Sequence, residues 1–178
     1  MQVNPARGTE MTVMTDAHPD HTVERCTNPL RVNSVVELVD RVGQHLGHSS
    51  WHRVDQRLID AFADATGDRQ WIHVDPARAS VGPYGTTVAH GLLVLSLVPK
   101  LVYEVYRVAG VRAVVNYGLE RVRFPAPVRA GSRLRAAVEL ISVTDCHGGV
   151  HVVSRVTVEI DGTTKPACVA DTVTRFYH

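Results

Sequence analysis

The sequence has little of what marks secreted, membrane-spanning or nucleic-acid-binding proteins. Its three cysteines, Cys26, Cys146 and Cys168, are an odd number whose spacings match no zinc or redox motif. The 19 Lys and Arg residues nearly balance the 18 Asp and Glu residues, so the net charge of +1 provides no long-range attraction for nucleic acid or anionic lipid. No long apolar segment occupies the N-terminus, which argues against a secretory signal or a membrane span. These absences predict a cytoplasmic protein with no nucleic-acid or membrane partner.

Length and composition predict one folded domain. The 178 residues fit a single domain, and a hydrophobic share of 44% is enough for one core. Residues 1–30 are rich in Asn, Thr, Pro, His and acidic residues and show no hydrophobic period, which is typical of a disordered tail. We therefore expect the domain to cover residues 31–178.

Two helices are predicted early in this domain. Ser34 and Glu37 have the spacing of a capping box, followed by an apolar stripe of helical period. Asp55 is the expected N-cap of a second helix, and Gly67 is its expected end. The connection between the two helices includes residues 50–54, which are long enough for a short edge strand.

Further along the chain, a helical period gives way to a period of two. The apolar run over residues 91–105 predicts a helix buried on most sides, with a kink or break at Pro99. After it, alternating apolar and polar residues predict antiparallel strands that are half buried. Four such strands are expected, over residues 112–124, 132–145, 150–160 and 165–177. The predicted class is α+β, with a curved antiparallel sheet wrapped around a central helix.

The stretch over residues 65–73 carries the most informative polar side chains. It follows the second helix as a loop on a rigid scaffold, where functional residues concentrate. Asp68 and His73 within it are side chains suited to transferring protons to and from a substrate or water. Gly91 opens the apolar helix downstream, so its backbone N–H is available to stabilise negative charge.

These residues resemble the signature of the R-specific enoyl-CoA hydratases, also called MaoC-like dehydratases, which have the hot-dog fold. That signature is small-Gly-Asp-x-Asn-Pro-apolar-His, followed downstream by His-Gly at the start of the central helix. The matching residues are Thr66-Gly67-Asp68, Ile72-His73 and His90-Gly91. The similarity covers residues 34–177 and extends to the mycobacterial single-hot-dog hydratases through residues 116–119, 122–128 and 165–170. The departure is Gln70-Trp71 in place of Asn-Pro, which removes a residue that stiffens the loop.

The resemblance implies reversible hydration of a trans-2-enoyl-CoA to an (R)-3-hydroxyacyl-CoA. It implies that Asp68 and His73 activate the water, in acid and base roles that stay open, and that the Gly91 amide forms the oxyanion hole. The residues expected to bind substrate are Trp71, Gly85, His90 and Arg123. No metal and no cofactor beyond the substrate's own CoA is expected. A homodimer is expected as well, since pairing removes the exposed edge of the sheet.

Two other functions stay open, an acyl-CoA thioesterase of the same fold and a non-catalytic acyl-CoA-binding partner subunit. A thioesterase is expected to have a carboxylate on or beside the central helix, and residues 88–98 contain no acid. A non-catalytic subunit is expected to have lost Asp68 or His73, and this chain has both.

Two further clusters have an ordinary structural interpretation beside a functional one. The histidines at 45, 48 and 52 have no cysteine or carboxylate at a matching spacing, which argues against a metal site. An arginine cluster either covers a solvated sheet face or binds the phosphates of CoA. Its members are Arg121, Arg123, Arg129, Arg133 and Arg135. The aromatic residues expected to limit the acyl pocket are Trp71, Tyr84, Tyr103 and Tyr106.

Overall fold

The computed structural model describes residues 28–177. The predicted tail falls almost entirely on residues 1–27, which lie outside the described part, while Leu30 already begins the first strand. In chain order the elements are β1 (Leu30–Val32), α1 (Val36–Val39), β2 (His45–His48), β3 (His52–Arg53), α2 (Gln56–Thr66), α3 (Trp71–Val74), α4 (Pro76–Ser80), α5 (Gly91–Val105), β4 (Tyr106–Val108), β5 (Ala113–Arg123), β6 (Arg133–Cys146), β7 (Gly149–Ile160) and β8 (Cys168–Tyr177).

One antiparallel sheet forms the main layer of the domain. Its strand order is β2-β6-β7-β8-β5, and β3 also pairs with β6. The long strands agree with the four predicted ones to within about three residues at each end, and the two-residue β3 confirms the predicted edge strand. A separate parallel pair joins β1 to β4. The predicted α+β class and curved antiparallel sheet are therefore confirmed.

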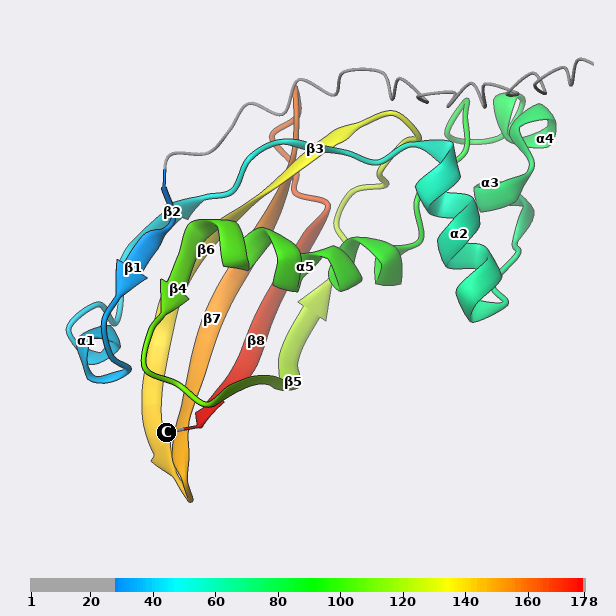
Figure 1. The fold of residues 1–178 in the computed structure, drawn as a ribbon. Helices are drawn as coiled ribbons and strands as arrows, with labels where there is room; N and C mark the ends of the chain where they lie inside the picture. Colours follow the sequence, from blue (N-terminus) through cyan, green and yellow to red (C-terminus); the bar gives the residue numbers. More distant parts are fainter. Residues whose placement is uncertain (1–27, 178) are drawn as a thin grey trace, which may run out of the picture.

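The central helix α5 lies across the concave side of this sheet (Figure 1). Its inward side chains Leu93, Val94 and Leu101 are almost fully buried. They pack in the core with the alternating inward residues of β6, which are Leu134, Ala136, Val138 and Leu140, all with no exposed surface. The period of two therefore marked the core face of the sheet correctly.

Of the kink or break predicted at Pro99, the break is absent, because α5 continues from Gly91 to Val105. Proline lacks the N–H that would bond the carbonyl four residues earlier, so α5 lacks one internal hydrogen bond. Packing supports the helix on both sides of Pro99, because Val98 and Leu101 are buried. Tertiary contacts therefore outweigh the local preference of proline.

The predicted first helix is present only as the single turn α1, and the predicted capping box is wrong. Ser34 makes no capping hydrogen bond, and Val35 occupies the N-cap position. The Glu37 carboxylate instead accepts hydrogen bonds from the backbone N–H of Asn33 at 3.2 Å and from its side-chain amide at 3.1 Å. This short helix therefore begins one residue later than predicted, and only Leu38 within it is buried.

Strand β5 is the last strand of the sheet and is exposed along almost its whole length. It was predicted to be half buried, and in this chain that prediction is wrong because only β8 pairs with it. Its exposed side chains include large apolar ones, namely Val114, Val115, Tyr117 and Leu119. An apolar edge strand of this kind is a surface that proteins normally cover.

Helices α2, α3 and α4 form a small layer beyond the N-terminal end of α5 (Figure 1). The α2 prediction is confirmed, since the Asp55 side chain accepts a hydrogen bond from the Leu58 N–H at 2.9 Å and Gly67 ends the helix at φ +77°. The segment predicted as a loop is partly helical, because His73 lies within the single turn of α3. Within residues 28–177 no helix is long and apolar enough to cross a membrane.

Candidate active site

Asp68 and His73 come together beside the start of α5. A carboxylate oxygen of Asp68 and ring nitrogens of His73 and His90 all lie within 4.8 Å of one another. His73 is buried, with 7% of its surface exposed, whereas Asp68 is exposed. The left-handed turn at Gly67 directs the chain from α2 towards α3 and so brings Asp68 over the imidazole. The predicted pair is therefore close in space, with Asp68 exposed to solvent and His73 buried.

The imidazole of His73 is fixed by a backbone carbonyl. Its Nδ1 lies 2.6 Å from the carbonyl oxygen of Val88. A carbonyl only accepts, so Nδ1 carries the proton in this bond, and Nε2 has a free lone pair in the neutral ring. Ring orientation and tautomer are thus set before any ligand binds.

Two residues that sequence reasoning missed hold the backbone around His73. The side-chain amide of Gln56 donates to the His73 carbonyl at 2.8 Å and to the Asp60 carboxylate at 2.7 Å. Thr87 donates its hydroxyl to the Gln56 side-chain oxygen in a short hydrogen bond. These contacts span 17 and 31 residues of sequence, so no local motif announces them.

His90 occupies the N-cap position of α5 and is 3% exposed. Its Nε2 lies 2.9 Å from the backbone carbonyl oxygen of Asp68. Its ring stacks on that of His73 with centroids 3.7 Å apart and an angle of 24° between the planes. It also contacts the ring of Phe62 at 5.1 Å. The residue expected to bind substrate is thus a buried link between the loop, α3 and α5.

Gly91 is the first residue of α5, so its N–H has no acceptor within the helix. A Cβ added to Gly91 would lie 2.9 Å from the Cδ2 atom of Phe124. A residue without a side chain lets another group approach the backbone closely. In the structure, the aromatic ring of Phe124 uses that space beside the α-carbon.

Comparison with known proteins assigns the family. The MaoC like domain matches residues 37–161, which is most of the chain. The 3-hydroxyacyl-thioester dehydratase Z of Mycobacterium tuberculosis is 50% identical over 144 residues, covering 80% of this chain and 95% of that protein. This chain belongs to the MaoC-like dehydratase family. The nodulation protein N of Rhizobium leguminosarum bv. viciae is 43% identical over 145 residues, covering 79% of this chain and 89% of that protein.

Solved structures confirm the fold that the resemblance implied. An R-hydratase from Pseudomonas aeruginosa matches with a TM-score of 0.61, covering 77% of this chain and 82% of that one at 23% identity. The predicted hot-dog architecture is thereby confirmed. The family places the chain among hydro-lyases, enzymes that add or remove water.

The other predicted substrate-binding residues of this MaoC-like chain, Trp71, Gly85 and Arg123, make contacts of their own outside the Asp68–His73 pair. The ring of Trp71 packs under the Arg78 guanidinium at 4.4 Å. Gly85 forms an exposed turn with φ +70°. Arg123 is exposed at the end of β5 and donates to its neighbour's carbonyl, that of Val122, at 2.8 Å. Arg123 therefore lies close to α5, because the next residue in the chain packs against Gly91.

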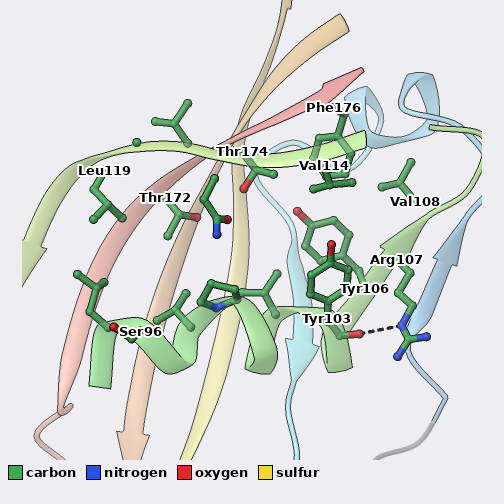
Figure 2. A pocket seen from close by; sticks show the side chains of 17 residues that line it. Ser96, Tyr103, Tyr106, Arg107, Val108, Val114, Leu119, Thr172, Thr174 and Phe176 are labelled. Carbon is green, nitrogen blue, oxygen red and sulfur yellow. Dashed lines mark hydrogen bonds between the residues drawn. The ribbon is translucent and has the colours of Figure 1, made fainter. Parts of the chain in front are cut away.

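A cavity of about 510 Å³ lies between α5 and the strands β5 and β8 (Figure 2). Figure 2 shows Ser96 and Leu119 towards one end and Tyr103 and Tyr106 towards the other. It is mostly apolar, and its first helix residue, Leu95, is one turn beyond Gly91, about 6 Å along the axis. Tyr103 and Tyr106 line this cavity, whereas Trp71 and Tyr84 do not.

The arginine cluster divides into paired and exposed members. The Arg133 guanidinium bonds the Asp161 carboxylate at 2.6 Å, and Arg135 bonds Glu159 at the same distance. These two support the interpretation as a sheet face held by ion pairs. The remaining three are exposed on or after β5, where binding of CoA phosphates stays a hypothesis; they are Arg121, Arg123 and Arg129.

The donor set of Asp68, His73 and His90 is one that zinc accepts. The two rings are stacked and nearly parallel, so their lone pairs run side by side instead of converging on one ion. One nitrogen of each ring also contacts a carbonyl. This geometry fits a metal poorly. Among the described residues, the histidines at 45, 48 and 52 form no such three-ligand group, and His52 instead pairs with Glu104 at 2.7 Å.

Proposed function

We propose that this MaoC-like dehydratase catalyses the reversible (R)-specific hydration of trans-2-enoyl-CoA to (R)-3-hydroxyacyl-CoA. The observation that carries the proposal is the imidazole of His73, which is fixed through Nδ1 by the Val88 carbonyl and has a ring nitrogen within 4.8 Å of an Asp68 carboxylate oxygen. Two hydrogen bonds of ordinary length, about 2.8 Å each, span a separation of about 5 Å when one water lies between. The separation of up to 4.8 Å between these groups therefore suits a single bridging water.

In this mechanism the bridging water adds to the double bond. Its oxygen forms a bond to C3 while one of its protons passes to Nε2 of His73, and Asp68 accepts a hydrogen bond from the other. The electrons of the C2–C3 double bond move onto the thioester oxygen as an enolate. The carbonyl then re-forms as C2 takes the proton back from His73 on the same side. Water is thus added in the syn sense, and both side chains return to their starting state.

The N-terminus of α5 is the proposed oxyanion site. The Gly91 N–H is unpaired within the helix, and the helix dipole adds partial positive charge at this end. A donor aimed at the enolate oxygen lowers the barrier only because the charge grows in the transition state. The reaction moves protons alone, so it requires no metal or redox cofactor.

The cavity beside α5 is the proposed site of the acyl chain. It begins one helical turn beyond Gly91 and is mainly apolar, and a volume of about 510 Å³ falls within the usual range for ligand pockets. We therefore expect faster hydration of medium or long enoyl chains than of crotonyl-CoA. The exposed arginines Arg121, Arg123 and Arg129 are the proposed contacts for CoA phosphates.

We further propose that the protein works as a cytoplasmic homodimer. Strand β5 presents unpaired backbone groups and large apolar side chains along one edge of the sheet. A second copy placed against that edge would cover both. The free thiols of Cys146 and Cys168 fit a reducing compartment.

The test follows one reaction by three readouts. Purified protein is mixed with trans-2-enoyl-CoA substrates of increasing length, and loss of enoyl absorbance, free thiol and product configuration are measured. The proposal predicts loss of absorbance, no free thiol and an (R)-3-hydroxyacyl product. Release of free thiol would instead identify a thioesterase. Tight binding of the substrates without turnover would identify a binding subunit.

A further inference from the structure

We infer that His90 is a positioning residue that holds Asp68 and His73 in register with the N-terminus of α5. The inference rests on the proposed function for its catalytic consequence and on the described contacts for its geometry. His90 directly precedes Gly91, so the position of the His90 backbone sets the position of the first amide of the helix. Its ring also contacts the backbone of Asp68 and the ring of His73.

The other hydrogen bonds of Asp68 itself are long, although the next residue, Arg69, is ion-paired with Asp64. The Asp68 N–H reaches the Thr66 hydroxyl only at 3.4 Å, and its carboxylate accepts from the Gln70 N–H only at 3.5 Å. The bond from His90 to the Asp68 carbonyl, at 2.9 Å, is the shortest of the three. An exposed carboxylate between two helices would otherwise sample several orientations, and each unproductive one reduces the rate.

The direction of this bond defines the state of the His90 ring. The Asp68 carbonyl can only accept, so Nε2 of His90 carries the proton and donates it. Nδ1 is buried with no partner among the described residues. A buried acceptor without a partner costs stability, which an apolar residue at this position would avoid. Retaining an imidazole here fits a role that depends on the donor at Nε2.

His90 also restrains the ring of His73 by stacking on it. The centroids of the two rings are 3.7 Å apart, and Nδ1 of His73 is hydrogen-bonded to the carbonyl oxygen of Val88. Translation of the His73 ring towards His90 is therefore blocked. The positions of the Asp68 carboxylate, the His73 imidazole and the Gly91 amide thus all depend on the buried side chain of His90. In the proposed mechanism His90 itself does not touch the reacting atoms.

Two amide variants separate the hydrogen bond from general polarity. In His90→Gln, the side-chain N–H has about the reach of Nε2, whereas in His90→Asn it is too short to reach the Asp68 carbonyl. We expect His90→Asn to lower kcat by about 10- to 100-fold with little change in KM, because Asp68 is misplaced. His90→Gln should recover most of that loss. Thermal unfolding of both variants shows whether either has lost its fold.

Hydrogen exchange of the backbone amides at residues 68–70 tests the same claim without activity. Exchange should be faster in His90→Asn than in the wild-type protein and close to wild type in His90→Gln. Unchanged exchange in His90→Asn, or equal loss of kcat in both folded variants, would overturn the positioning role. Absence of hydration by the wild-type protein would count against the proposed function alone, since the exchange measurement still decides the restraint on the loop.

Discussion

Backbone carbonyls fix the two imidazoles of the site. His73 bonds the Val88 carbonyl and His90 bonds the Asp68 carbonyl. A carbonyl cannot donate, so each bond defines which ring nitrogen carries the proton, independently of pH-dependent side-chain partners. The tautomer of His73 is therefore a property of the fold and does not depend on substrate binding.

Replacement of Gly91 by Ala should reduce both activity and stability. The added Cβ would lie 2.9 Å from the Phe124 ring, which is closer than normal packing permits. The expected loss in the free energy of unfolding is about 1–3 kcal/mol, together with a lower kcat because the first turn of α5 shifts. Chemical denaturation and steady-state kinetics measure the two effects.

The second substitution Phe124→Leu in the same chain should restore part of both losses by removing the ring. Gly118→Ala is the control for stability, since a Cβ there meets nothing within 4 Å. If Gly91→Ala were as stable and active as the wild type, the close packing of Phe124 would not constrain the helix start.

Cys168 should resist thiol reagents in the folded protein. Burial raises the pKa of its thiol to about 11, from a usual value of 9.0. At pH 8 only about 0.1% is then thiolate, the reactive form. Labelling with iodoacetamide followed by peptide mapping should modify the partly exposed Cys146 first and Cys168 only after denaturant is added. Equal labelling rates at the two positions in native buffer would contradict the burial.

At the scale of elements, the sequence predicted those helix boundaries that depend on neighbouring residues. Asp55 and Gly67 bound α2 in the sequence and in the structure, because a cap and a left-handed glycine act on their immediate neighbours. Such signals failed at the single turns, since α1 was predicted as a longer helix capped by Ser34 and α3 as part of a loop, and neither has a side-chain cap. The unbroken α5 likewise depends on packing and not on its own sequence at Pro99.

Replacement of Asp55 by Ala should weaken α2. The carboxylate accepts the Leu58 N–H at 2.9 Å, so its loss leaves a helix-start donor unsatisfied. We expect the free energy of unfolding to fall by about 1 kcal/mol and the melting temperature by about 2–4 °C. Asp40→Ala, at an exposed position at the end of α1, is the control. Equal melting temperatures for both variants would show that the cap contributes nothing.

The same limit explains how much of the site could be predicted. Asp68, His73 and Gly91 followed from a family motif that is short in sequence. The contacts of Gln56, Thr87 and Val88 that orient His73 join residues 15 to 31 positions apart. No period or cap signals such pairs, because they exist only once α2, α3 and the segment before α5 have packed together.

At the scale of the whole molecule, strand β5 is the exposed edge strand of the sheet. It borders the cavity and ends in Arg123, so a partner bound at this edge would lie next to the proposed acyl and CoA contacts. The apolar side chains of β5 are exposed in the single chain. A second copy at this edge would change the surroundings of both cavity and substrate, which links assembly to activity.

Replacement of Val115 by Lys should disrupt this assembly. Val115 is 43% exposed on β5 and lies outside the cavity lining, and a lysine on an edge strand opposes pairing with another strand. We expect a smaller particle by size-exclusion chromatography with light scattering. Val81→Lys, at a position 87% exposed in another part of the surface, should leave the size unchanged. A Val115→Lys protein of wild-type size would place the contact elsewhere.

The most direct test of the central claim is kcat for hydration of one enoyl-CoA by Asp68→Asn and His73→Gln, compared with the wild type and with Asp64→Asn. Both substitutions keep size and hydrogen-bonding capacity but remove the carboxylate and the imidazole. We predict that kcat falls by about 10²- to 10⁴-fold in each, while Asp64→Asn stays near wild type. Wild-type kcat in either folded variant would contradict activation of water by this pair.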